Sequence, residues 1–265
     1  MTEPADKNSL AAKHILVIRP QRQDDQLLSM LENTGAQVTH TPVMAIEPII
    51  ESPEIESPEI KSQQIKRQIL DIDNFHKAIF VSGNAADLAI EWIDKYWPML
   101  PVGIEYFAVG ESTAAQLKEA DINALCPRGR QNSEALLQLE QLQQLENQRV
   151  IIFRGVGGRE ILAETLTARG ARVEYCELYK RVVDSQQLAL AQQQKADCLV
   201  AHSGELIQAM GEAEGTLFVD TAVVVPSERV AAIARELGYR RVISAENALP
   251  KSMLAAVSKA LDTGI

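Results

Sequence analysis

The sequence contains few of the residues from which metal sites and disulfide frameworks are built. Its 265 residues include only three cysteines and four histidines. Cys126, Cys176 and Cys198 are far apart and odd in number, there is no C-x-x-C, and the histidines form no pair at ligand spacing. We therefore expect reduced thiols, no disulfide framework and no metal site.

Long hydrophobic runs are also missing. No apolar stretch approaches the ~20 residues that span a bilayer, and residues 1–13 lack the apolar core of a signal peptide. These absences predict a cytoplasmic protein with no membrane partner, in which residues 1–13 are a disordered lead. Residues 51–62 contain the tandem repeat ESPEI-ESPEI, which is acidic and interrupted by proline. We interpret this segment as an acidic surface insertion.

Basic residues are too few for a nucleic-acid binder. The formal net charge is −10, whereas nucleic-acid binding requires a basic face. The same charge would repel an anionic substrate, so any anion site must be locally basic. Aromatic residues make up 5% and hydrophobic residues 46% of the chain, which is enough to build two aliphatic domain cores.

What the sequence does contain is a repeated pattern. Residues 149–181 read as a buried strand, a glycine-rich turn, an amphipathic helix and a second strand, and residues 14–43 follow the same plan. Aligning the copies pairs Arg19 with Arg154, Leu27 with Leu162, Leu31 with Leu166, Gly35 with Gly170, Ala36 with Ala171 and Val38 with Val173. Two β-α-β units with equal internal spacing indicate a duplicated fold.

The rest of the chain alternates between predicted strands and helices. Strands are expected at 77–81, 105–109, 122–125, 198–201, 221–225 and 241–243. Helices are expected at 85–96, 114–120, 133–147, 186–195, 230–237 and 251–261. Such alternation with short loops indicates parallel sheets covered on both faces. The predicted fold class is α/β, with two doubly wound parallel-sheet domains of flavodoxin-like or Rossmann-like type.

Two divisions into domains are compatible with this pattern. Either each domain is contiguous, or the middle of the chain is inserted between its two ends. We favour the second division because two extended segments lie where the chain would cross, and they could pair as a two-stranded connector. The predicted parts are residues 14–43 plus 184–265 for domain 1, 71–175 for domain 2, and 44–50 with 176–183 for the connector.

Small, hydroxyl-bearing and arginine residues follow most of the predicted strands. Ligands bind beyond the carboxyl ends of strands in open parallel sheets, where helix N-termini favour anions and arginines add forked donors for carboxylates. Two such domains facing each other would form a cleft for a polyanionic small molecule. The predicted substrate-binding residues are Arg19, Ser82, Gly83, Asn84, Gly110, Thr113, Arg154, Gly155, Ser203, Gly204, Ser227 and Arg229.

Each of these features also has a structural interpretation. The serines could only cap helices, and Arg19 and Arg154 could form structural ion pairs. The glycines after Arg154 miss the dinucleotide pattern G-x-G-x-x-G because its last position holds Glu160. His202 does not lie in a G-x-S-x-G motif and is read as a turn residue. The residues alone do not define a nucleophile with its base.

Several motifs resemble those of the bacterial uroporphyrinogen-III synthases. They are R-G-x-G-G-R-E at 154–160, T-A-R-G-A-x-V at 167–173, Y-C-E-x-Y-x-R at 175–181 and S-E-R at 227–229, and the likeness extends from about residue 14 to 261. The resemblance implies two α/β domains joined by a two-stranded connector, and no cofactor. It also implies a lyase of porphyrin and heme biosynthesis, which cyclises hydroxymethylbilane with loss of water and inverts its last pyrrole ring to give uroporphyrinogen III.

In that family a tyrosine on the connector is the candidate catalytic residue, and it matches Tyr179. It would donate a hydrogen bond to the departing hydroxyl group; alternatively, Tyr179 only packs the connector. The implied partner is the poly-carboxylate tetrapyrrole hydroxymethylbilane, without nucleic acid. A monomer with a transient contact to the preceding pathway enzyme is expected. The alternative function is a non-catalytic two-domain binding protein for an anionic small molecule.

Overall fold

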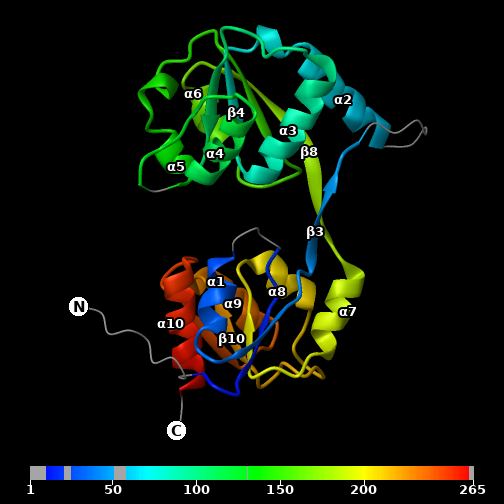
Figure 1. Cartoon of the computed structure of the whole chain (residues 1–265), viewed down its shortest axis with the longest axis vertical. Coiled ribbons are helices and arrows are strands. Elements are labelled where there is room, and N and C mark those ends of the chain that lie inside the picture. The colour runs from blue at the N-terminus through cyan, green and yellow to red at the C-terminus, as the bar shows by residue number, and fades with distance from the viewer. Residues whose placement is uncertain (1–9, 21–24, 51–57, 130, 263–265) are drawn as a thin grey trace. The chain divides into compact units, whose positions relative to one another are not determined.

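The computed structural model describes residues 10–20, 25–50, 58–129 and 131–262. The chain divides into two compact units (Figure 1): unit 1 comprises Met1–Ala45 and Val182–Ile265, and unit 2 comprises Ile46–Arg181. The chain passes from one unit to the other within strand β3 (Met44–Pro48) and again within strand β8 (Arg172–Val183). Unit 1 is therefore assembled from both ends of the described chain.

Unit 1 contains a five-stranded parallel sheet in the order β11-β10-β9-β1-β2. Its strands are β1 (His14–Val17), β2 (Gln37–His40), β9 (Cys198–Val200), β10 (Ala222–Val225) and β11 (Arg241–Ser244). Its helices are α1 (Gln26–Glu32), α7 (Ser185–Gln193), α8 (Gly204–Met210), α9 (Glu228–Glu236) and α10 (Pro250–Leu261). Alternate residues of β10 enter different cores, with Val223 facing the α8 and α9 side and Val224 the α10 side. Burial on both faces explains why these strands are continuous apolar runs.

Unit 2 contains a six-stranded sheet in the order β3-β8-β7-β4-β5-β6. The strands not yet given are β4 (Lys77–Phe80), β5 (Glu105–Ala108), β6 (Ala124–Leu125) and β7 (Arg149–Gly155). The helices are α2 (Pro58–Leu70), α3 (Gly83–Tyr96), α4 (Glu111–Glu119), α5 (Ser133–Leu136) and α6 (Ile161–Ala168), with short 3-10 turns η1 (Ile72–Asn74) and η2 (Glu140–Leu142). Figure 1 shows α2 and α3 on one side of the sheet, and α5 and α6 on the other. The prediction of parallel sheets covered on both faces is confirmed.

The two sheets share one spatial plan. The order β2-β1-β9-β10-β11 in unit 1 corresponds to β8-β7-β4-β5-β6 in unit 2, so the repeated β-α-β unit occupies the same place in each sheet. In both sheets its first strand lies beside a strand from a different part of the chain, β9 or β4. Such a junction is the switch point at which open α/β sheets bind ligands. The duplicated arginines Arg19 and Arg154 lie at these two junctions.

Strands β3 and β8 are neighbours at the edge of the unit 2 sheet. The amide of Ile49 donates to the carbonyl of Leu178 at 2.8 Å, and that of Asp184 donates to Val43 at 3.0 Å. Residue numbers thus rise along one segment as they fall along the other, which is the antiparallel arrangement. Pro48 is compatible with this edge position because proline cannot donate to a ladder.

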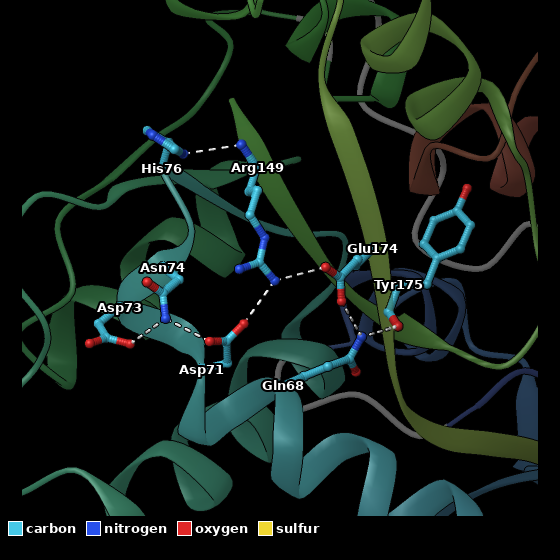
Figure 2. A network of polar contacts seen from close by, with 8 residues as sticks. All are labelled: Gln68, Asp71, Asp73, Asn74, His76, Arg149, Glu174 and Tyr175. Atoms are coloured by element: carbon cyan, nitrogen blue, oxygen red, sulfur yellow. Dashed lines mark hydrogen bonds and ion pairs between the residues drawn. The ribbon is translucent and has the colours of Figure 1, made fainter. Parts of the chain in front are cut away.

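Helix α2 covers the part of β8 that lies before its pairing with β3. The Gln68 amide nitrogen donates to the carbonyl oxygen of Tyr175 at 3.1 Å and to a carboxylate oxygen of Glu174 at 3.3 Å (Figure 2). Ile65 and Ile69, one helical turn apart, are buried in the core on the same side. Covering a strand edge in this way prevents pairing with another chain.

Two segments differ in part from what the sequence predicts, the acidic surface insertion at 51–62 and the disordered lead at 1–13. Within residues 51–62, residues 51–57 lie outside the described chain, whereas 58–62 begin helix α2 and Ser62 is buried. Pro58 suits the first turn of a helix, because the amide hydrogen that proline lacks is not needed there. Within residues 1–13, residues 1–9 lie outside the described chain, but Leu10 is buried in the core of unit 1.

The predicted helix at 133–147 is also wrong. Only α5 and the turn η2 form there, and Leu139 between them is extended. Leu136, Leu137, Leu142 and Leu145 are all buried in one core. On a continuous helix these four leucines would be spread over more than half of the circumference. The broken backbone lets all four reach the core.

Candidate functional site

The site residues of unit 2 gather where β4, β7 and β8 end or change partner. Ser82 follows β4 and caps helix α3, because its hydroxyl oxygen accepts from the amide of Ala85 at 3.2 Å. Tyr179 lies on β8 opposite Gly155 of β7, at a bulge in the register. The hydroxyl oxygens of Ser82 and Tyr179 are 3.1 Å apart, and the Tyr179 side chain is buried. Parallel pairing thus joins residues from three distant segments.

Gly155 is required by the position of the Tyr179 ring. A Cβ atom at position 155 would lie 2.5 Å from Cε2 and 2.8 Å from Cζ of Tyr179. Contacts this short do not occur between real side chains, so a larger residue would displace the ring. The amide of Val156 also donates to the carbonyl of Tyr179 at 2.8 Å. Two consecutive residues at the end of β7, Gly155 and Val156, therefore fix the ring and the backbone of Tyr179.

Arg154 is buried at the end of β7 and is held from several sides. Its guanidinium lies over the Tyr175 ring, 4.3 Å from the ring centre, and is 3.4 Å from a Glu160 carboxylate oxygen. The Tyr175 hydroxyl donates to the other Glu160 oxygen at 2.6 Å. Burial, followed by the contact with Glu160, raises the pKa of Tyr175 to about 12. Arg154 thus combines a structural ion pair with a fixed charge at the strand end.

A cavity of about 180 Å³ opens at this place. The residues that line it come from β7, the turn after it, and β8, with a few from neighbouring elements. They are Val81, Ser133, Ile152, Arg154, Gly155, Gly157, Gly158, Arg159, Leu162, Tyr175, Tyr179 and Arg181. Among these described residues three are arginines and none is acidic. The lining itself is therefore basic in a chain whose formal net charge is −10, as an anion site requires. Two of its arginines have carboxylate partners outside the lining, Arg154 with Glu160 and Arg159 with Glu134.

In unit 1 the equivalent arginine lies in a tighter ion pair. Arg19 is buried, and its Nε atom lies 3.2 Å from Oδ2 of Asp25. Asp25 also caps α1 by accepting from the amides of Leu27 and Leu28. The Nη1 atom of Arg19 is 3.2 Å from Nε2 of His202. These contacts match the structural interpretation of Arg19, and the histidine that the sequence assigned to a turn lies beside it.

The other predicted residues lie at helix starts, outside the residues that line this cavity. Ser203 caps α8 by accepting from the Leu206 amide at 3.3 Å, whereas Ser227 precedes α9 and makes no side-chain cap bond. Asn84 and Arg229 are exposed. Gly83, Gly110, Thr113 and Gly204 lie in or next to the first turns of α3, α4 and α8. Of the twelve predicted binding residues, the cavity brings together Arg154 and Gly155.

Four polar residues of the cavity wall are not among those predicted from the sequence. These are Ser133, Arg159, Tyr175 and Arg181. Three of them lie within the motifs quoted for the resemblance, so the signal was present. Their position could not be predicted because it depends on how β8 pairs with β7 and on the turn at Gly157 and Gly158, both of which have positive φ.

A larger cavity, of about 370 Å³, lies between α2 and β8. Its charged lining residues are Lys61, Glu174 and Glu177, and Lys61 pairs with Glu177 at 3.1 Å. Glu174 is held by Gln68 and Arg149 (Figure 2). Two carboxylates against one ammonium group make this cavity unsuitable for an anion. Although this cavity is larger, it is therefore the poorer candidate for an anion site.

The fold defines a protein of two α/β units, each built on a wholly or mainly parallel sheet with small residues at its strand ends. The arginine-lined cavity beside a buried tyrosine is compatible with an anionic small molecule. In the described part of the chain, no helix is both long and apolar enough to cross a membrane.

A sequence profile of the family described as uroporphyrinogen-III synthase HemD matches residues 9–255. The uroporphyrinogen-III synthase of Escherichia coli (strain K12) is 33% identical over 256 residues, covering 92% of this chain and 99% of that protein. The one from Salmonella typhimurium is 38% identical over 173 residues, covering 62% of this chain and 69% of that protein. The chain belongs to the uroporphyrinogen-III synthase family, whose members cyclise hydroxymethylbilane in tetrapyrrole biosynthesis.

Solved structures agree on the fold. Uroporphyrinogen III synthase from the extremely thermophilic bacterium Thermus thermophilus, in a mutant form, superposes with a TM-score of 0.57 at 17% identity, covering 94% of this chain and 99% of that one. The Helicobacter pylori 26695 enzyme gives a TM-score of 0.59 at 14% identity, covering 93% and 99%. The predicted family, enzyme class and α/β fold are confirmed.

Proposed function

We propose that the basic cavity of unit 2 binds carboxylates of hydroxymethylbilane and that Tyr179 assists loss of its hydroxyl group, giving uroporphyrinogen III. The observation that supports this proposal is the lining of the cavity. Arg154, Arg159 and Arg181 meet Tyr179 there, and no acidic residue is present among the described lining residues. A poly-carboxylate substrate needs such positive charge, and forked guanidinium groups match carboxylates.

The chemistry asked of the residues is modest. The C–O bond of the hydroxymethyl group breaks, and negative charge develops on the departing oxygen. The Tyr179 hydroxyl donates a hydrogen bond to that oxygen and so stabilises the charge, while the arginines fix the pyrrole rings through their carboxylates. Orientation then decides which carbon of the last ring closes the macrocycle. A single contact of this kind contributes roughly 10²-fold or more.

The test uses the purified full chain with hydroxymethylbilane and separation of the porphyrin isomers after oxidation. The wild-type chain should form the III isomer. Tyr179→Phe keeps the ring and removes only the donor, so formation of the III isomer should slow by roughly 10²-fold. The share of the I isomer should rise, because the substrate also closes unaided. Formation of the III isomer by Tyr179→Phe at the wild-type rate would leave Tyr179 with a packing role.

Tyr239→Phe is the matched control for loss of a buried phenol. Tyr239 is buried in unit 1, and its hydroxyl donates to the carbonyl of Gly211 at 3.2 Å. Its replacement should cost roughly 1 kcal/mol of stability and leave the isomer ratio unchanged.

The arginines are tested by binding. Arg159→Ala should weaken binding of the product uroporphyrinogen III roughly 10-fold, since a hydrogen bond to a charged group contributes about 1.5 kcal/mol or more. Arg240→Ala is the matched control. Arg240 pairs with Asp220 at 3.2 Å as Arg159 pairs with Glu134 at 3.1 Å, both arginines are exposed, and Arg240 is not among the residues that line the cavity. Equal affinities of the two variants would contradict the carboxylate role. If the wild-type chain bound the product tightly and formed no III isomer, the non-catalytic binding function would be correct.

The remaining predictions stay proposals. Arg19, Ser203, Gly204, Ser227 and Arg229 of unit 1 are candidates for further carboxylates of the substrate. Gly83, Asn84, Gly110 and Thr113 of unit 2 are candidates at its other strand ends. A cytoplasmic location is supported by the bacterial relatives. The monomeric state is expected because the sequence suggests no long exposed apolar stripe, and a transient contact with the preceding pathway enzyme stays a proposal.

A further inference from the structure

The geometry points to Ser82 as a positioning residue that directs the Tyr179 hydroxyl hydrogen into the cavity, through a hydrogen-bond chain that begins at the N-terminus of α3. This inference rests on the proposed role of Tyr179. It gives Ser82 a function different from substrate binding, because Ser82 acts on the substrate only through Tyr179.

Three groups follow one another in this series of hydrogen bonds. The amide of Ala85, in the first turn of α3, donates to the hydroxyl oxygen of Ser82 at 3.2 Å. The same oxygen lies 3.1 Å from the hydroxyl oxygen of Tyr179. Tyr179 lines the cavity. The hydrogen-bond series therefore runs from a helix terminus, through a serine and a tyrosine, to the place proposed for the leaving group.

Either hydroxyl can be the donor between Ser82 and Tyr179, and the proposal takes the direction in which Ser82 donates. A serine hydroxyl has one hydrogen to donate and can accept two, so Ser82 can accept from Ala85 and still donate to Tyr179. Donation by Ser82 leaves the phenolic hydrogen of Tyr179 for the substrate. The opposite direction would spend that hydrogen on Ser82, and Tyr179 could not assist the departing hydroxyl group.

The helix favours the first direction. Helix α3 has 14 residues, and its N-terminus carries partial positive charge. Donors that point from this terminus toward the cavity stabilise negative charge on the leaving oxygen. Hydrogen bonds in such a series also polarise one another, which makes the last donor stronger.

The position of Ser82 behind Tyr179 argues against direct binding of the substrate. Val81 is among the described residues that line the cavity, and Ser82 is not. Gly155 fixes the ring on one side, since a Cβ there would lie 2.5 Å from Cε2. Ser82 then fixes the rotation of the hydroxyl group, which the packing of a ring cannot do.

Ser82→Gly is the test variant. Glycine is tolerated at the first position before a helix at a cost of only a few tenths of a kcal/mol relative to serine, so the hydroxyl is lost while the helix start is kept. The kcat for the III isomer should fall about 10-fold, as expected for a lost hydrogen bond to a developing charge, with KM unchanged. Ser82→Thr restores a hydroxyl and should recover most of the activity.

Two comparisons separate this role from a structural one. Asp184→Gly removes another helix cap, which accepts from the amides of Gln186 and Gln187, and should leave kcat unchanged. The double variant Ser82→Gly with Tyr179→Phe should be no slower than Tyr179→Phe alone, because the donor that Ser82 directs is already missing.

The inference is overturned if Ser82→Gly has the wild-type kcat, if it raises KM instead, or if the double variant loses a further 10-fold. A Tyr179→Phe variant that works at the wild-type rate overturns the proposed role of Tyr179 together with this one. A slow Tyr179→Phe beside an unaffected Ser82→Gly overturns the role of Ser82 alone.

Discussion

The ring of Tyr179 occupies the space that a side chain on Gly155 would need. A Cβ at position 155 would lie 2.5 Å from Cε2 of that ring, and the two residues are opposite each other in the β7–β8 register. The place of the candidate catalytic residue is thus set by the absence of a side chain on the neighbouring strand.

Gly155→Ala should therefore lower the catalytic rate by more than its loss of folding stability would suggest. The ring must shift, and its hydroxyl then loses its alignment with Ser82, so the rate of III isomer formation should fall at least 10-fold. Overpacking of this kind costs about 1–3 kcal/mol. Gly103→Ala is the control: its φ is +89°, and no atom lies within 4 Å of the added Cβ. It should show backbone strain of about 1 kcal/mol and no change in isomer ratio. Denaturant unfolding and isomer analysis measure both effects.

The second prediction concerns Arg149, whose Nη2 atom lies 2.8 Å from Asp71 and 2.9 Å from Glu174 (Figure 2). Its hydrogen bond and charge, helped by Asn74, lower the pKa of Asp71. A carboxyl whose folded pKa is lowered stabilises the protein above its unfolded pKa, near ~3.9, and loses this effect as the pH falls through the folded value. Because the Asp71 carboxylate and part of the Arg149 guanidinium are open to solvent, Arg149→Gln should cost only about 0.5–1 kcal/mol at pH 7.

That cost should shrink as the pH falls below about 4, and denaturant midpoints of both proteins at neutral and acid pH measure it. Arg240→Gln, which removes a more exposed pair with Asp220, should have almost no effect at either pH. A cost for Arg149→Gln that stays the same in acid would show that packing of its guanidinium on the Phe75 ring, 4.3 Å away, matters more than its charge.

The third prediction concerns thiol reactivity. Burial raises the pKa of Cys176 and raises that of Cys198 to about 12, while Cys126 is only partly buried. Since the thiolate is the reactive form, an aromatic disulfide reagent should modify Cys126 first in the folded protein. The other two thiols should react only after denaturant is added. The Cys126→Ser variant keeps only the two buried thiols, Cys176 and Cys198. Rapid modification of this variant in its folded state would show that the cores open locally.

The fourth prediction concerns independent folding of unit 2. A fragment of residues 46–181 is one continuous segment with its own two cores and should unfold cooperatively. A fragment of residues 71–175 lacks Ile65, Ile69 and Tyr179, which are buried in one of these cores, and should be several kcal/mol less stable. Denaturant unfolding followed by circular dichroism compares them. Equal stability of both fragments would mean that α2 and the end of β8 add little to the core.

The sequence by itself determined the duplicated β-α-β unit, the parallel sheets and the family. These follow from local patterns: apolar runs, glycines after helices, and motifs whose residues are close in the chain. The same locality explains the failures. Helix α2 begins inside an acidic repeat that contains proline, and the leucines after Ser133 suggested a continuous helix, although only contacts with a distant core decide both cases.

The site shows the same division more sharply. The sequence could nominate Arg154, Gly155 and Ser82 as separate candidates at strand ends, and the resemblance added Tyr179 on the predicted connector. It could not show that Ser82 touches Tyr179, since 97 residues separate them, nor that Arg159 and Arg181 share one cavity with Arg154. Pairing of β7 with β4 on one side and with β8 on the other creates these contacts. Register between strands is a tertiary property, and it alone decides which of the candidate side chains meet.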